Sequence, residues 1–165
     1  MVKHIDMMGA IELAMDAEEK ARRFYEDGGQ KTEHPLGREL FRQLAAFEAN
    51  HYLQLKRLLD SLKASGRFIA YQGTSCTKTG ADTPAASGDE PNKDQLLDIL
   101  NTAIRSEEEA QKRYADLARS TNDVSGRDMF LKLSEEEKVH ARILNDEFYN
   151  LSNAGAWSSK SLWSE

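Results

Sequence analysis

Two Glu-x-x-His motifs in this sequence could bind metal ions, because residues three apart on a helix lie on the same face. A further glutamate precedes each motif by 30 residues. The candidate ligands are Glu18, Glu48, His51, Glu107, Glu137 and His140. Carboxylates with one imidazole per ion suit iron or manganese better than zinc or copper, and bridging carboxylates would hold two ions within about 4 Å. The set predicts a two-metal centre with two iron ions, in which manganese or zinc could substitute.

The candidate ligands belong to an internal repeat with an offset of 89 residues and no gap. The matching pairs are Ala14/Ala103, Glu18/Glu107, Ala21/Ala110, Tyr25/Tyr114, Gly37/Gly126, Arg38/Arg127, Phe41/Phe130, Leu44/Leu133, Glu48/Glu137, His51/His140 and Leu55/Leu144. A repeated core would explain the apolar pairs, but it would not explain charged residues at inward positions. The repeat therefore favours one shared metal site over two chance surface motifs.

Each candidate glutamate lies on an apolar helix face. Ala14, Glu18, Ala21 and Tyr25 are spaced by four, three and four residues and therefore share a face. Glutamate is rarely buried unpaired, because a carboxylate in a low-dielectric core is strongly destabilised. Four buried carboxylates would also repel one another, and two divalent ions would cancel their charge.

Tyr25 and Tyr114 are the candidate supporting residues of the site. They lie two helical turns from the glutamates, where a hydroxyl group could hydrogen-bond a carboxylate from across the bundle. They could equally be ordinary core aromatics, and their pairing in the repeat favours the supporting role.

Other ionisable residues near the motifs are interpreted as solvent-exposed. The acidic residues in this group lie about 100° round the helix from the ligand face or on the outer surface. They are Glu19, Glu108, Glu109, Glu135 and Glu136. His4 and His34 have no partner in the repeat and are expected to be exposed. The single cysteine, Cys76, rules out an intrachain disulfide and a four-cysteine iron centre in these 165 residues.

Four segments have helical periodicity. We expect helices from about Asp6 to Asp27, from Pro35 to near Gly66, from Asn92 or Asp94 to about Arg119, and from about Asp123 to Leu151. The pair Gly28-Gly29 is expected to end the first helix, and Pro35 is a favoured first-turn residue. Short links join the first two helices and the last two, which predicts two antiparallel hairpins.

A stretch rich in Gly, Ser, Thr, Ala and Pro, about residues 65–93, separates the two hairpins. It could run the length of a bundle or link separate domains, but each half alone would expose an apolar face. We therefore expect an all-α, ferritin-like four-helix bundle over residues 1–151, with one long crossover. Exchange of hairpins between subunits is an alternative. Residues 152–165 form a tail whose large apolar residues, Trp157, Leu162 and Trp163, are expected to pack on the bundle or on a second subunit.

The overall composition excludes several classes of partner. A net charge of −6 argues against binding to nucleic acid or an anionic membrane. No apolar run approaches the roughly 20 residues that span a bilayer, and the N-terminal residues lack the apolar stretch of a secretion signal. We expect a cytoplasmic protein.

The sequence resembles the rubrerythrin branch of the ferritin-like superfamily. The stretches ELAMDAEEKARRFY and NTAIRSEEEAQKRY are similar to that family's Glu-x-x-Ala-x-x-x-Tyr helices, and LFRQLAAFEANH and MFLKLSEEEKVH to its Glu-x-x-His helices. The resemblance implies that Glu18 and Glu107 are terminal ligands, that Glu48 and Glu137 bridge two irons, and that each histidine binds one iron.

The resemblance also implies a function and partners. Such proteins typically reduce hydrogen peroxide at a di-iron centre and are often dimers. Typical members carry a rubredoxin-like domain that delivers electrons, so this chain would need an external donor protein. They also carry an extra glutamate where this chain has Ala110. That difference leaves a ferroxidase acting on dioxygen, a protein that only binds or delivers iron, and a purely structural metal site as alternatives.

Overall fold

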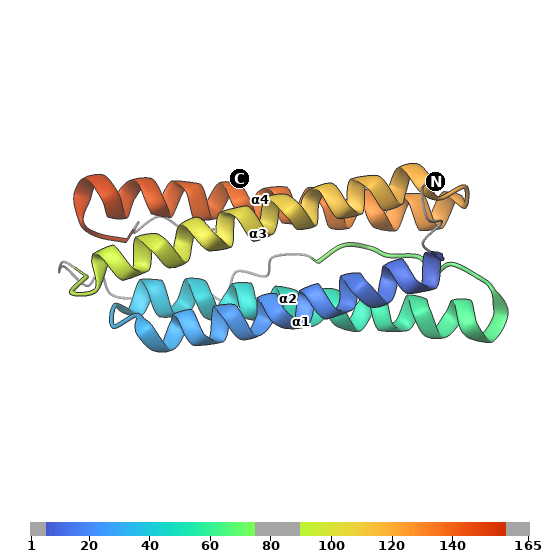
Figure 1. Cartoon of the computed structure of the whole chain (residues 1–165), viewed down its shortest axis with the longest axis horizontal. Helices are drawn as coiled ribbons and strands as arrows, with labels where there is room; N and C mark the ends of the chain where they lie inside the picture. The colour runs from blue at the N-terminus through green and yellow to red at the C-terminus, as the bar shows by residue number, and fades with distance from the viewer. Residues whose placement is uncertain (1–5, 75–89, 158–165) are drawn as a thin grey trace.

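The computed structural model describes residues 6–74 and 90–157, which fold into four helices and contain no strand. The helices are α1 (Met7–Lys31), α2 (Pro35–Ser65), α3 (Lys93–Ser120) and α4 (Val124–Ala154). Figure 1 shows α1 and α2 as one antiparallel hairpin lying beside a second hairpin of α3 and α4. The predicted all-α four-helix bundle is therefore confirmed. No helix in the described ranges is long and apolar enough to cross a bilayer.

The two hairpin links are built in the same way. Arg38 donates to the carbonyl oxygen of Thr32 over 2.7 Å, and its repeat partner Arg127 donates to that of Thr121 over 3.3 Å. The following helices begin with side-chain caps, because His34 accepts from the N–H of Leu36 and Asp123 accepts from that of Gly126. Both links are thus fixed by residues at equivalent places in the repeat.

The first helix does not end at Gly28-Gly29, as expected from sequence, but continues to Lys31. A Cβ atom added to Gly28 would lie 3.2 Å from Cε1 of Phe41, which is tighter than most side-chain contacts. The glycine therefore allows α1 and α2 to approach closely, and it remains helical because this packing compensates for its low helix propensity. Left-handed glycines end α2 and α4, with φ of 70° at Gly66 and 69° at Gly155.

The apolar core has two parts, one towards each end of the bundle. One part includes Tyr25, Phe41, Leu100, Leu144 and Trp157. The other includes Ile11, Leu55, Tyr114, Met129 and Phe130. The buried acidic residues and histidines at the candidate ligand positions lie on the same four helices, and burial of the two apolar clusters holds those helices together.

The beginning of the crossover turns back at the end of α2 and runs towards the middle of the molecule, drawn in green in Figure 1. Asn50 of α2 donates to Oγ1 of Thr74 over 2.7 Å, and Lys132 of α4 donates to the carbonyl oxygen of Tyr71 over 3.0 Å. Residues 67–74 therefore bridge α2 and α4. The rest of the predicted crossover up to residue 89, including Cys76, lies outside the described residues, as do His4, Leu162 and Trp163.

The described part of the tail packs on the bundle. Trp157 is buried, meets Phe41 edge to face at a centroid distance of 6.1 Å, and donates to Glu90 over 3.0 Å. Glu90 also accepts from the backbone N–H of His34 over 3.3 Å. His34 is 8 % exposed, so its expected exposure is wrong, because it caps α2 beneath this carboxylate.

Candidate metal centre

The six candidate ligands converge at one place inside the bundle. Each helix supplies one or two of them: Glu18 from α1, Glu48 and His51 from α2, Glu107 from α3, and Glu137 and His140 from α4. None is more than 3 % exposed. The helical spacing of each Glu-x-x-His motif places both side chains on the inner face, as predicted.

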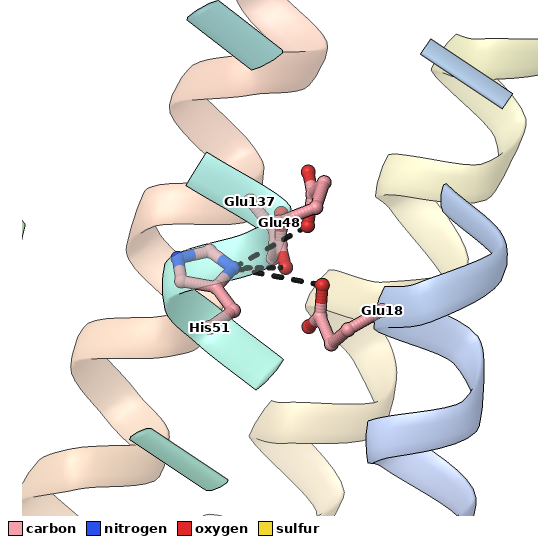
Figure 2. Close-up of side chains that lie close together, drawn as sticks. All are labelled: Glu18, Glu48, His51 and Glu137. Atoms are coloured by element: carbon pink, nitrogen blue, oxygen red, sulfur yellow. Dashed lines mark hydrogen bonds and ion pairs between the residues drawn. The ribbon is translucent and has the colours of Figure 1, made fainter. Parts of the chain in front are cut away.

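Three carboxylates surround one ring nitrogen of His51. Figure 2 shows Glu18, Glu48 and Glu137 pointing towards this nitrogen from three different helices. The distances from Nδ1 of His51 to the nearest carboxylate oxygens are 3.7 Å for Glu18, 3.5 Å for Glu48 and 3.1 Å for Glu137. One donor atom from each of these four side chains lies within 4.8 Å of the others.

His140 is surrounded in the same way. Its Nδ1 atom lies 3.7 Å from Glu107, 3.5 Å from Glu48 and 3.1 Å from Glu137. These four residues form a second compact set of donor atoms, and Glu48 and Glu137 belong to both sets. The two imidazole rings stack at a centroid distance of 5.8 Å. The repeat in the sequence therefore becomes a near-twofold arrangement of two ligand sets with two shared carboxylates.

The two tyrosines join the hairpins through two carboxylates of the cluster, Glu107 and Glu18. The hydroxyl group of Tyr25 on α1 donates to Glu107 on α3, and that of Tyr114 on α3 donates to Glu18 on α1. Both tyrosines are buried. The structure thus places both hydroxyl groups across the bundle from their own helix, so that each fixes the carboxylate of the other hairpin.

The carboxylates differ in their protonation because they crowd one another. Burial, followed by the charges of Glu137 and Glu107, raises the pKa of Glu48 well above its usual value. Burial and the charge of Glu107 likewise raise the pKa of Glu137 to about 8. Burial also opposes the charged form of Glu18, but hydrogen bonds with Glu48 and His51 outweigh it and lower its pKa to about 2.

Burial acts on the histidines in the opposite direction, because their charged form is the protonated one. Burial would lower the pKa of His51, but the charge of Glu137 and the hydrogen bond with Glu136 raise it well above its usual value. Burial is likewise outweighed at His140, where hydrogen bonds with Glu107 and Glu137 raise the pKa. Without metal, the cluster therefore holds protons that partly balance its negative charge.

The donor set fits divalent metal ions. Oε1 of Glu48 is fully buried and accepts no hydrogen bond from any described residue, which is costly for a carboxylate oxygen in a dry core. Four carboxylates and two imidazoles offer oxygen and nitrogen donors of the kind that iron and manganese prefer. Metal ions at the two donor sets would satisfy this oxygen and displace the protons.

Glu136 is a residue of the site that sequence reasoning placed on the surface, and that interpretation is wrong. One of its carboxylate oxygens lies 2.8 Å from Nε2 of His51, on the opposite side of the ring from the cluster. Burial would raise the pKa of Glu136, but the bond with His51 lowers it. A signal was present in the repeat, because the equivalent position is Phe47. An acidic residue that replaces a large apolar one is expected to face a neighbouring element.

The other acidic residues behave largely as expected. Glu108, Glu109 and Glu135 are exposed. Glu19 is partly covered by its ion pairs with Arg22 and Arg23 on the outer face of α1.

The fold and this cluster define a four-helix bundle with a carboxylate–histidine site suited to metal. A family model described as rubrerythrin matches residues 3–72 and 98–156, which include nearly all of both hairpins and all six candidate ligands. The chain belongs to the rubrerythrin family. No curated protein matches it.

A solved structure gives the same architecture. A hypothetical protein from Pyrococcus furiosus superposes with a TM-score of 0.74, covering 94 % of this chain and 96 % of that one. The two sequences are 19 % identical, so the likeness supports the fold alone.

Proposed function

We propose that this protein is a non-haem di-iron oxidoreductase that reduces hydrogen peroxide with electrons from an external donor. The observation that carries the proposal is the pair of mirrored ligand sets that share Glu48 and Glu137 in a water-excluded core. Membership of the rubrerythrin family supports it.

The residues would divide the work by position. Glu18 and Glu107, each in one set only, would hold one ion each at its outer side, whereas Glu48 and Glu137 would bridge. Two bound ferrous ions would supply one electron each, so that hydrogen peroxide and two protons become two water molecules. Tyr25 and Tyr114 hold the outer carboxylates in place, and the two apolar clusters keep bulk water away.

Re-reduction of the ions requires a partner. The 165 residues contain one cysteine, so they hold no four-cysteine iron centre that could pass electrons to the site. We propose a separate electron-donor protein for this step. The homodimer and the cytoplasmic location inferred from sequence stay predictions.

A ferroxidase, in which dioxygen oxidises bound iron, is the second candidate, together with iron binding without turnover. The observation that favours it is Ala110, which packs beside the apolar cluster and offers no donor atom where the family typically has an extra glutamate. Each ligand set is then complete without a seventh protein ligand.

The two functions can be separated by rapid mixing. The protein would be loaded anaerobically with Fe(II) and mixed with hydrogen peroxide or with oxygenated buffer in a stopped-flow instrument. We expect oxidation by peroxide to be faster than oxidation by oxygen and faster than that of free Fe(II). Faster oxidation by oxygen would favour the ferroxidase. If neither oxidant acts faster than on free Fe(II), the oxidoreductase proposal is wrong and an iron-binding role is supported.

A further inference from the structure

The two histidines of the cluster are held by different groups at equivalent places. On the outer side of the His51 ring, a carboxylate oxygen of Glu136 accepts a hydrogen bond from Nε2 of His51 over 2.8 Å. The repeat places Phe47 at the corresponding position near His140, and the two rings lie 5.0 Å apart between centroids. Phe47 has no carboxylate, so the near-twofold symmetry of the candidate ligands does not extend to positions 47 and 136.

Glu136 is itself held firmly. Its Oε2 atom accepts from the hydroxyl group of Tyr71 over 2.7 Å, and its Oε1 atom accepts from the backbone N–H of Thr74 over 2.6 Å. Gly73 has a φ of 82°, and a Cβ atom there would lie 3.3 Å from Oε1 of Glu136. Residues 71–74 of the crossover therefore form a cradle around this carboxylate, whose side chain is 18 % exposed.

This arrangement determines which nitrogen of His51 faces the cluster. With Nε2 bonded to Glu136, Nδ1 points at Glu18, Glu48 and Glu137. A carboxylate that accepts from the outer N–H of a ligating imidazole fixes the tautomer and the ring orientation and strengthens the ligand, and its loss typically costs 10–100-fold in metal affinity.

We propose that Glu136 is a positioning residue for one metal position only, the one formed by Glu18, Glu48, His51 and Glu137. Through His51 it makes the affinity of that position depend on the crossover segment 71–74, while the position at His140 is independent of it. The inference rests on the proposed two-metal site, but not on any reaction at that site.

The test is anaerobic titration with Co(II), followed by calorimetry and by the visible absorption of the bound ion. We expect Glu136→Gln to weaken one of two binding steps by roughly 10–100-fold and to leave the other within about threefold. The matched control is Glu135→Gln, which makes the same chemical change one residue away on an exposed side chain. It should leave both steps unchanged.

A second measurement identifies the affected position. In protein titrated with Zn(II), the ring ¹⁵N–¹H signals of His51 and His140 report binding at each position separately. In Glu136→Gln, we expect His140 to reach its bound chemical shift at lower zinc than His51, and the Nε2 proton of His51 to exchange faster with water. Tyr71→Phe, which removes one bond to Glu136 and keeps the carboxylate, should give a smaller change of the same kind.

The outcomes separate this inference from the proposed function. If two ions bind and Glu136→Gln affects both binding steps equally, or affects neither step, the inference alone is wrong. An effect confined to His140 would likewise overturn the inference alone. A wild-type protein that binds fewer than two ions would overturn the inference and the di-iron proposal together, whereas slow oxidation of a fully loaded protein would overturn only the latter.

Discussion

The α1–α2 and α3–α4 hairpins present their candidate ligands with similar geometry but support them differently. The repeat relates the His51–Glu18 distance to the His140–Glu107 distance, and both are 3.7 Å. From each histidine to the glutamate of its own motif, the distances are 3.5 Å for Glu48 and 3.1 Å for Glu137. Outside the cluster, Glu136 bonds to Nε2 of His51, whereas the equivalent Phe47 lies next to the ring of His140. The repeat thus keeps the same residue types at similar distances where both halves share the site, but it places different residue types one layer further out.

The ends of the hairpins show the same contrast. Phe68, after α2, packs on Gly126 of α4, where an added Cβ atom would lie 2.5 Å from its ring. Trp157, after α4, packs in the same way on Gly37 of α2, where an added Cβ atom would lie 2.6 Å from its ring. Phe68 and Trp157 are also 89 residues apart, so the repeat extends beyond Leu144. The chain after Phe68 continues to the Glu136 cradle, whereas Trp157 bonds to Glu90. Phe68 and Trp157 therefore occupy equivalent positions, but the polar contacts next to them differ.

The largest expected effect tests the symmetry of the ligand sets. We expect Glu48→Ala and Glu137→Ala each to abolish binding of both ions, because both carboxylates belong to both sets. Glu18→Ala and Glu107→Ala should each lose about one ion of two. Metal analysis after anaerobic desalting measures this. If Glu48→Ala or Glu137→Ala still binds two ions, the substituted residue does not serve both ligand sets.

Metal removal is expected to make stability depend on pH. Folding raises the pKa of Glu137 from 4.5 to about 8, mainly through burial, and raises that of Glu48 as well. A group whose pKa is raised by folding stabilises the protein fully below its unfolded pKa and loses this contribution as pH rises to the folded pKa. The metal-free protein should therefore lose stability between about pH 4.5 and pH 8.

Bound metal displaces these protons, so the loaded protein should not lose stability in that window. At a free metal concentration a thousandfold above Kd, the ion adds about 4 kcal/mol. Urea denaturation at several pH values, with metal and with chelator, measures both effects. If stability changes with pH in the same way with metal and with chelator, metal does not bind at Glu48 and Glu137.

The tyrosine bonds should contribute equally in the two halves. Tyr25→Phe removes the donor to Glu107, and Tyr114→Phe removes the donor to Glu18. We expect each change to lower the free energy of unfolding by about 1.5–3 kcal/mol, the range for hydrogen bonds to charged groups. Chemical denaturation of the loaded protein measures this. A difference larger than about 1 kcal/mol between the variants would show that the halves are not equivalent here.

The smallest expected effect concerns the two glycines at the hairpin ends. Gly37→Ala and Gly126→Ala would bring a methyl group against Trp157 and Phe68, respectively. Overpacking of this kind costs about 1–3 kcal/mol. The control is Gly29→Ala, where the added Cβ would make an ordinary contact at 3.5 Å with Phe41. If both end variants match this control in thermal unfolding, the aromatic contacts do not constrain the ends.

The sequence predicted the fold and the six converging residues because helical periodicity and the repeat encode them directly. Glu18 and His51 share inward faces with apolar residues, so their burial followed from spacing alone. The roles of Glu136 and His34 were missed because both depend on the crossover. Residues 71–74 cover Glu136, and Glu90 covers His34. Neither segment has a period that predicts where it packs.

The end of α1 was also misplaced for a reason of tertiary packing. In the sequence, Gly28 indicates the end of a helix. In the structure, it is helical, and its lack of a side chain leaves room for the ring of Phe41. Local propensity alone does not distinguish these two uses of glycine.

The crossed bonds of Tyr25 and Tyr114 mean that neither hairpin contains a complete site. Two identical hairpins could build such a centre as a symmetric pair of chains, but every residue would then appear on both sides. Covalent fusion of the halves removes that constraint. In a single chain, position 136 can carry a carboxylate that bonds to His51 while the equivalent position 47 carries a phenyl ring, so a substitution in one half need not be matched in the other.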